Sequence, residues 1–293
     1  MKISVIVPSY NQALYLPATL DSLAAQNYAD LEVHVYDGGS TDGSVEVLRG
    51  HPARFAWVSE RDGGQAEAIN RGLQEASGDV LAYLNSDDVY YPGTLNRVAD
   101  YFLSHPDCQI LYGDAHHLQA DGAIMETYRT EPWNYGRLQE VCFVCQPAVF
   151  WRREVVERFG LLDDSLHFAL DYEYWLRIGR HTAFHHLKGQ FLAGSRLHAA
   201  TKTLSQQVKA HREILQVVLR HGGSPTAVLG WLSHLAYYEA SAVAAPASQL
   251  LAERQLYIRL FVAAVLKNAA NFEIRLTSQG LRELDGHLKG AGY

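Results

Sequence analysis

The sequence predicts an α/β fold, with a mostly parallel sheet flanked by helices and a helical C-terminal region. Short β-branched runs alternate with helix-like segments through the first hundred residues, and this alternation favours right-handed crossovers between parallel strands. From about residue 204 onward the pattern is helical, with Ala- and Leu-rich stretches. The chain of 293 residues is long enough for one large domain and an appendage. We therefore expect two domains, 1–203 and 204–293.

The first part of the chain is expected to contain four strands with helices between them. The predicted strands are 3–7, 31–37, 55–60 and 80–86, and the helices are marked by the stripe Leu16, Leu20 and Leu23, by 44–50 and by 64–77. In such sheets ligands bind outside the carboxyl ends of the strands. Polar residues that directly follow these strands are therefore candidates for a site.

Beyond Gly93 the pattern changes to added antiparallel strands. We predict a helix at 94–105, extended segments at 109–118, 123–129 and 146–152, a helix at 171–181 and a last extended piece over 195–203. The helical region that follows is interrupted by "GGSP" at 222–225 and by Pro246. Its apolar stretches could form a dimer seam, contact a membrane surface or pack onto their own domain.

Composition argues against several classes of partner. Lys and Arg number 25 against 32 Asp and Glu, a net charge of −7, and no long basic run is present that would follow a nucleic acid backbone. No stretch has the roughly 18 apolar residues of a spanning helix. Three cysteines are too few for a disulfide framework, and Cys142 and Cys145 lack a second pair for zinc. We expect a cytoplasmic protein, with any membrane contact at the inner face.

Asp37 ends the second predicted strand and is followed by "GGSTDGS". Its carboxylate could accept a hydrogen bond from a nucleobase imide, although a strand-to-helix turn with a capping residue explains the same pattern. In "RDGGQAEAINRG", Arg61 and Gln65 lie near a helix start and Asn70 lies inside the helix. Backbone N–H groups at a helix start, together with a guanidinium, suit a diphosphate or a base edge. An ordinary amphipathic helix start is the alternative.

Asp87 and Asp88 directly follow the fourth strand. Two adjacent carboxylates repel unless a cation or proton holds them together, so a hard divalent metal is one explanation. A solvated turn before Pro92-Gly93 is the other.

Asp171 opens a helical run, where it could cap the helix or act as a general base. His198, in "SRLHAATKT", could bind a metal or diphosphate or be an ordinary polar residue.

Taken in order, the motifs resemble glycosyltransferase family 2 enzymes of the GT-A fold across about residues 1–203. They are "SVIVPSYNQALYLPATLDSLAAQ", "VYDGGSTDGS", "DGGQAEAINRG", "GDVLAYLNSDD", "CQPAVFWRREV" and "LDYEYWLRI". The resemblance implies an inverting transferase that uses a nucleotide-diphosphate sugar, linked to UDP, dTDP or GDP, and a divalent cation, Mn²⁺ or Mg²⁺. It implies a glycan, lipid-linked or other hydroxyl acceptor, in polysaccharide or glycoconjugate biosynthesis.

The resemblance also implies roles for individual residues. Asp171 would be the catalytic base, and Asp88 the direct metal ligand. The nucleotide or donor sugar would contact Pro8, Tyr10, Asn11, Asp37, Arg61, Gly64, Gln65, Asn70, Asp87 and His198, with His198 also a candidate metal ligand. The chain departs from the family pattern at Asn85, where relatives often have an acid, and at Leu170, where they have a glutamate.

Two other functions are compatible with an α/β layout. A sugar-phosphate nucleotidyltransferase would need a Gly-rich, basic loop after the first strand, and this chain has "PSYNQ" there. A non-catalytic nucleotide- or carbohydrate-binding scaffold would keep the pocket without turnover.

Overall fold

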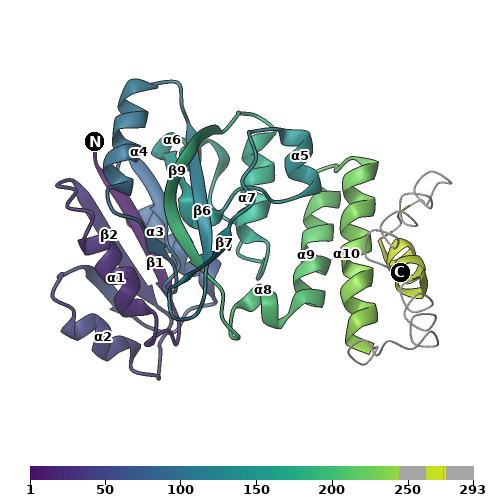
Figure 1. Ribbon diagram of the computed structural model, residues 1–293, viewed down its shortest axis with the longest axis horizontal. Coiled ribbons are helices and arrows are strands. Elements are labelled where there is room, and N and C mark those ends of the chain that lie inside the picture. The colour runs from purple at the N-terminus through teal and green to yellow at the C-terminus, as the bar shows by residue number, and fades with distance from the viewer. Residues whose placement is uncertain (244–261, 273, 275–293) are drawn as a thin grey trace. The chain divides into compact units, whose positions relative to one another are not determined.

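The computed structural model describes residues 1–243, 262–272 and 274, and it confirms the α/β class (Figure 1). The chain divides into two compact units. The first comprises Met1–Tyr135 and Cys142–Ala199, and the second comprises Gly136–Val141 and the chain from Ala200 onward. The division into domains at residue 203 stays a prediction.

The first unit contains all the strands of the part of the chain that the structure describes. In chain order its elements are β1 (Ile3–Ser9), α1 (Leu16–Ala24), β2 (Leu31–Asp37), α2 (Ser44–Gly50), β3 (Ala56–Ser59), α3 (Gln65–Glu75), β4 (Val80–Tyr83), β5 (Val89–Tyr90), α4 (Thr94–Ser104), β6 (Ile110–Leu118), β7 (Ile124–Thr127), the 3-10 turn η1 (Gln146–Ala148), β8 (Val149–Arg152), α6 (Arg153–Phe159), α7 (Leu170–Gly179) and β9 (His185–Arg196). Helix α5 (Tyr135–Glu140) begins at the end of its first segment.

These strands form one sheet in the order β3-β2-β1-β4-β8-β6-β9-β5, with β7 paired to β6. Strands β1 to β4 are parallel, β8 is antiparallel to both β4 and β6, and β6 is parallel to β9. The carboxyl ends of β1, β2, β3, β4, β6 and β9 therefore meet at one edge, which we call the carboxyl edge. Asp37 lies there, opposite Ser9 of β1 and Ser59 of β3.

Alternation along β1 directs its side chains to two apolar layers. Ile3, Val5 and Val7 pack in a cluster with residues of α1 and α4, because successive side chains of a strand point to opposite faces. On the other face Ile6 meets α3 at Gly72, where an added Cβ would lie 2.5 Å from a methyl carbon of Ile6. Glycine at position 72 therefore sets how closely α3 approaches the sheet.

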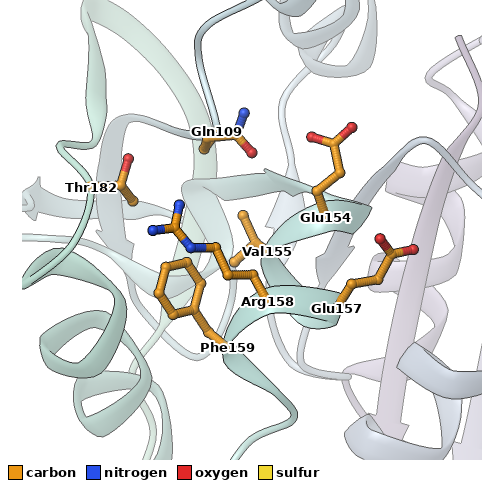
Figure 2. Close-up of a pocket in the computed structure, with 7 residues that line it drawn as sticks. All are labelled: Gln109, Glu154, Val155, Glu157, Arg158, Phe159 and Thr182. Atoms are coloured by element: carbon orange, nitrogen blue, oxygen red, sulfur yellow. The ribbon is translucent and has the colours of Figure 1, made fainter.

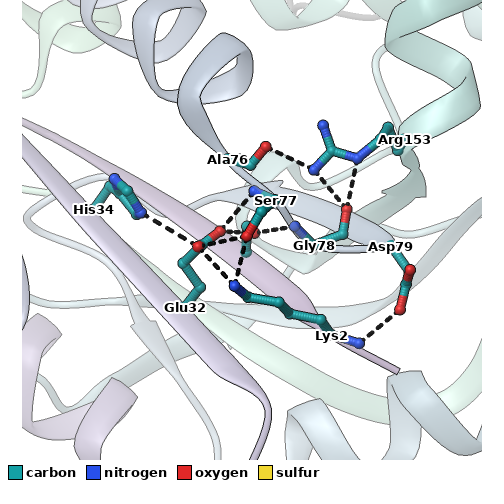
Figure 3. Close-up of polar contacts among 9 residues, drawn as sticks. Lys2, Glu32, His34, Ala76, Ser77, Gly78, Asp79 and Arg153 are labelled. Carbon is teal, nitrogen blue, oxygen red and sulfur yellow. Dashed lines mark hydrogen bonds and ion pairs between the residues drawn. The ribbon is translucent and has the colours of Figure 1, made fainter.

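The opposite, amino edge of the sheet is held by a polar network centred on Glu32 (Figure 3). Lys2 Nζ and Ser77 Oγ donate to Glu32 Oε1 at 2.8 and 2.7 Å, Ser77 N donates to Oε2 at 2.8 Å, and Ser4 Oγ donates to the same oxygen. Arg153 adds hydrogen bonds to the carbonyl oxygens of Ala76 and Gly78. The starts of β1, β2 and β4 are thus joined through side chains as well as through the backbone hydrogen bonds of the sheet. We call Lys2, Ser4, Glu32 and Ser77 the amino-edge network.

The second unit is helical in the residues that the structure describes. It contains α8 (Lys202–Ser205), α9 (Gln207–Arg220) and α10 (Pro225–Val243), and residues 262–271 are also helical. Trp231 Nε1 donates to the Gln139 carbonyl at 2.8 Å, which fastens α10 to the 136–141 segment of the same unit. Among the described helices, none combines the length and apolar character needed to cross a membrane. The predicted break at Pro246 lies outside the described residues.

The expectation of an extended segment over 195–203 was wrong beyond its second residue. Strand β9 ends at Arg196 and helix α8 begins at Lys202. Arg196 and His198 are therefore placed at a strand end and in the loop that follows it.

Candidate functional site

The acidic pair lies in the turn between β4 and β5, at the carboxyl edge. Asp88 N donates to the Asn85 carbonyl at 3.0 Å, which closes the turn. The Asp88 side chain is buried, and its carboxylate accepts from Arg196 N at 2.8 Å and from Asn85 Nδ2 at 3.2 Å. The Asp87 carboxylate instead lies 3.0 Å from His198 Nε2. Residues 87 and 198, far apart in sequence, therefore meet here.

The surroundings of this turn disfavour the ionised form of Asp88. Burial raises the pKa of Asp88 well above its usual range, and the neighbouring Asp87 carboxylate raises it further. The hydrogen bonds from Arg196 N and Asn85 oppose this shift without cancelling it. Because an opposite charge nearby favours the ionised form of a carboxylate, a cation at this turn would stabilise both acids.

Asp37 is buried at the ends of three strands. Its Oδ1 accepts from Ser40 Oγ at 2.5 Å, and its Oδ2 accepts from Ser40 N at 2.9 Å and from Ser59 Oγ at 2.7 Å. A carboxylate offers about four lone-pair sites. Three are used inside the protein, which leaves one acceptor position on Oδ1 of this buried carboxylate.

The segment after β1 runs beside the loop that follows Asp37. Asn11 has a left-handed backbone with φ of 51°, its N donates to Ser40 Oγ at 2.7 Å, and its Oδ1 accepts from Thr41 N at 2.9 Å. Tyr10 is 64% exposed, whereas Pro8 is buried within β1. The structure thus brings Asn11 next to the Asp37 loop and leaves the Tyr10 ring accessible.

The residues of the α3 region divide between two environments. Gln65 Nε2 donates to Asn85 Oδ1 at 2.8 Å, which connects the start of α3 to the acidic turn. Gly64, with φ of +128°, precedes that helix in a backbone conformation that favours glycine, and Arg61 is exposed. Asn70 uses both ends of its amide on the backbone of Leu162, at 2.9 Å each. We therefore do not keep Asn70 in the proposed site.

Asp171 lies in the first turn of α7, and its Oδ1 accepts from Tyr172 N at 2.8 Å. A carboxylate at a helix N-terminus is stabilised by the helix dipole. Asp171 and Asp88 both raise the pKa of Tyr83 and of Cys145, after the larger effect of burial. Asp171 and the acidic turn are thus linked here only through their common effect on these two buried groups.

The donor set at the turn fits a divalent cation that completes its coordination with other ligands. Asp87 and His198 offer a carboxylate oxygen and an imidazole nitrogen 3.0 Å apart. No group of three or more His, Cys, Asp or Glu suited to a metal occurs among the described residues. Mg²⁺ typically takes one or two carboxylates together with phosphates and waters, and carboxylate and water oxygens also suit Mn²⁺.

Sequence reasoning missed several residues of this region. Ser59 fixes the Asp37 carboxylate, Gln146 Oε1 accepts from Asn85 Nδ2 at 3.2 Å, and the Tyr15 ring lies 4.4 Å from the His198 ring. Tyr15 and Gln146 lie within motifs quoted for the family resemblance, but each of these contacts joins segments far apart in the chain, so no local pattern could have revealed the contacts.

A separate pocket of about 440 Å³ lies away from this site (Figure 2). Gln109 and Thr182 precede β6 and β9, and the pocket's other residues belong to α6, which follows β8. Those ends lie at the amino edge of the sheet. None of the predicted site residues lines this pocket, whose lining is Gln109, Glu154, Val155, Glu157, Arg158, Phe159 and Thr182.

Comparison with known sequences gives a consistent family assignment. Residues 4–160 match the family described as "Glycosyl transferase family 2". An uncharacterized glycosyltransferase of Nostoc sp. is 32% identical over 179 residues, which cover 56% of this chain and 54% of that protein. A "PGL/p-HBAD biosynthesis glycosyltransferase" of Mycobacterium bovis is 31% identical over 182 residues, covering 59% and 68%. The chain thus matches about half the length of the Nostoc relative.

Solved structures share the fold at low sequence identity. Residues 1–349 of S. aureus TarS, in complex with UDP-GlcNAc, align with a TM-score of 0.61 at 19% identity, covering 90% of this chain and 82% of that one. The mannosyltransferase PcManGT from Pyrobaculum calidifontis, in complex with GDP-Man and Mn²⁺, aligns with a TM-score of 0.60 at 19% identity, covering 100% and 81%. These matches confirm the expected GT-A fold.

Proposed function

The chain belongs to glycosyl transferase family 2, and from this premise we propose that it transfers a sugar from a nucleotide-diphosphate sugar to an acceptor hydroxyl, with inversion at the anomeric carbon. The acceptor would be a glycan, a lipid-linked sugar or another hydroxyl compound of polysaccharide or glycoconjugate biosynthesis. The observation that carries the proposal is the meeting of Asp87 with His198 at the carboxyl edge.

The donor would bind across the carboxyl edge. Asp37 has one acceptor position left for a base imide N–H, and uracil, thymine and guanine all carry such a group. Tyr10 offers an exposed ring for stacking on the base. Asn11, Arg61, Gly64 and Gln65 complete the donor side in this proposal. The related TarS and PcManGT structures contain UDP-GlcNAc and GDP-Man respectively, which supports a nucleotide-sugar donor of one of these classes.

Asp87 and His198 would hold the divalent cation, Mn²⁺ or Mg²⁺. Asp88 was the direct ligand expected from the sequence, but both of its oxygens accept protein hydrogen bonds, and Asp87 is the acid beside the imidazole. We therefore assign Asp88 to holding the shape and charge of the turn. The cation, when bound, supplies positive charge that stabilises the leaving diphosphate.

Asp171 would act as the general base in a single displacement. Its carboxylate takes the proton of the acceptor hydroxyl as that oxygen forms a bond to the anomeric carbon. The bond from the anomeric carbon to the diphosphate oxygen breaks in the same step, and its electron pair leaves with the nucleoside diphosphate. Attack from the face opposite the leaving group gives inversion.

Release of nucleoside diphosphate from a panel of UDP-, dTDP- and GDP-sugars, with and without Mn²⁺, tests the proposal. We expect cation-dependent release from one nucleotide class, and transfer once a suitable acceptor is added. A binding scaffold would retain nucleotide affinity and release nothing from any donor, with or without acceptor extracts. That outcome would contradict the proposed activity.

A role of the C-terminal helices in dimer formation or membrane contact stays a prediction, as does a cytoplasmic location. Sedimentation of the full chain, with and without lipid vesicles, would test dimer formation and membrane contact.

A further inference from the structure

Tyr15 contacts the loop that carries the proposed cation ligand. It directly precedes α1, and its ring centroid lies 4.4 Å from that of His198, with the planes inclined at 33°. The guanidinium carbon of Arg196 lies 5.3 Å from the centroid of the same ring. Both separations are within the range of aromatic and cation–π interactions. Tyr15 therefore touches both the last residue of β9 and the imidazole two residues further on.

Arg196 is fixed in place by carbonyl oxygens of two other segments. It is 6% exposed, its Nε donates to the Asp87 carbonyl at 2.8 Å, and its Nη1 donates to the carbonyls of Ala120 and Gln119 at 3.0 and 3.3 Å. These bonds join it to the acidic turn and to the β6–β7 hairpin. These hydrogen bonds make the guanidinium a fixed support for the Tyr15 ring.

The start of α1 is also joined to the acidic turn. Thr19 Oγ1 donates to the Asp88 carbonyl at 2.7 Å, one helical turn beyond Tyr15. Tyr15 thus lies between helix α1 and Arg196. Thr19 of α1 and Arg196 both donate hydrogen bonds to backbone carbonyls of the turn that contains Asp87. The distance between the Asp87 carboxylate and His198 Nε2, 3.0 Å, depends on the orientation of the His198 ring.

We propose that Tyr15, supported by Arg196, is a positioning residue that orients the His198 imidazole so that its Nε2 faces the Asp87 carboxylate. Partners that orient a ligating histidine influence metal affinity strongly. The inference rests on the proposed function, in which Asp87 and His198 hold the cation. It adds that the aromatic ring at position 15, and not its hydroxyl, sets the geometry of that pair.

A purely structural role for Tyr15 would have different consequences. Loss of packing at the start of α1 would lower thermal stability without a specific effect on the cation. Replacement of the ring by an aliphatic side chain would then resemble any other small loss of packing in α1. Leu20→Val is a matched control for this, because Leu20 is buried in the same helix.

The experiment is a titration of the full chain with Mn²⁺, in the presence of UDP or GDP, followed by the electron paramagnetic resonance signal of the free ion. We expect Tyr15→Leu to raise the apparent Kd for Mn²⁺ by about tenfold or more, and Tyr15→Phe to leave it within about twofold because the ring is retained. Leu20→Val should lower Tm and leave the Kd unchanged. Tyr15→Met, which is flexible and lacks a ring, replaces Tyr15→Leu if that variant does not fold.

Wild-type affinity in Tyr15→Leu or Tyr15→Met would overturn the inference and leave the proposed function intact. An equal loss in Leu20→Val would also overturn it, since the effect would then follow from stability. Absence of Mn²⁺ binding by the wild-type protein would contradict the cation site itself, so the two failures are distinguishable.

Discussion

The carboxylates at the two edges of the sheet are held in opposite ways. Glu32 at the amino edge is 18% exposed and accepts hydrogen bonds from Lys2, Ser4 and Ser77. Burial alone would raise its pKa, but these bonds together hold the pKa well below its usual range. Asp88 at the carboxyl edge is 3% exposed, lies beside the like charge of Asp87, and has its pKa raised. Protein donors stabilise the ionised acid at the amino edge, whereas at the carboxyl edge the ionised form of Asp88 is disfavoured unless an added positive charge stabilises it.

The comparison predicts that changes at the carboxyl edge impair activity and changes at the amino edge impair stability. Perturbed acids that a protein does not neutralise are typical of functional sites. Acids with complete sets of donors contribute instead to the folded state.

The largest effect is expected for Asp171→Asn. Loss of a general base typically costs about 10²- to 10⁴-fold in rate, and the amide preserves the size of the side chain in the first turn of α7. Steady-state kinetics should show the loss in kcat, while nucleotide binding by calorimetry stays near the wild-type value. Unchanged kcat would remove Asp171 from the proposed mechanism.

The next effect is expected for Asp87→Asn, which removes the charge beside His198. We expect the Mn²⁺ concentration needed for half-maximal activity to rise by about tenfold or more, since even residues that only support metal ligands give changes of about 10- to 100-fold. Asp114→Asn is a suitable comparison, because Asp114 also lies 2.8 Å from a histidine, His186. An equal response of both variants would argue against a cation at Asp87.

A smaller effect, on stability alone, is expected for Glu32→Gln. The substitution leaves Lys2 without its charged partner. A hydrogen bond to a charged group typically contributes about 1.5–3 kcal/mol to the free energy of unfolding. Urea denaturation should show a loss of about 1–3 kcal/mol, with kcat unchanged. Glu46→Gln, at an exposed position with a 3.9 Å ion pair, should leave both quantities unchanged. A reduced kcat in Glu32→Gln at saturating Mn²⁺ would contradict the prediction that changes at the amino edge affect stability and not activity.

The smallest effect is a pH dependence of the Glu32 contribution. The pKa of Glu32 is lower in the folded state than in the unfolded state, so its stabilisation is complete above the unfolded value of about 4.3 and is lost as the pH falls toward the folded value. The difference in unfolding free energy between wild type and Glu32→Gln should be constant from about pH 6 to pH 8 and shrink below about pH 4.5. A difference that grows in acid would contradict the lowered pKa.

The sequence was sufficient to predict the class of fold and the edge at which the site lies. Hydrophobic alternation and strand-to-helix turns are local signals, so β1 to β4 and their helices could be recognised in order. The sequence predicted Asp37 as the last residue of the second strand, where the structure also has it. It predicted the acidic pair directly after the fourth strand, but β4 ends at Tyr83 and the pair lies in the turn before β5.

The detailed contacts of the site could not be predicted in the same way. Whether Asp87 or Asp88 faces His198 depends on which carboxylate Arg196 N reaches, across 108 positions of sequence. Asn70 has a suitable place in a motif, but its amide is used by Leu162. The end of β9 was predicted too far along the chain, because Leu197 and the residues after it carry no strong breaker before α8. Such contacts arise only when distant segments are brought together.

In the proposed function, the carboxyl edge binds a nucleoside diphosphate together with a cation held by Asp87. The most direct measurement is the thermal shift of wild type, Asp87→Asn and Glu32→Gln with UDP, dTDP, GDP and CDP, each with and without Mn²⁺, since a ligand of the folded state raises apparent stability. We predict that one nucleotide gives a shift that requires Mn²⁺, that Asp87→Asn loses it, and that Glu32→Gln keeps it from a lower starting Tm. The same shift in Asp87→Asn, or no shift with any nucleotide in wild type, would contradict the claim.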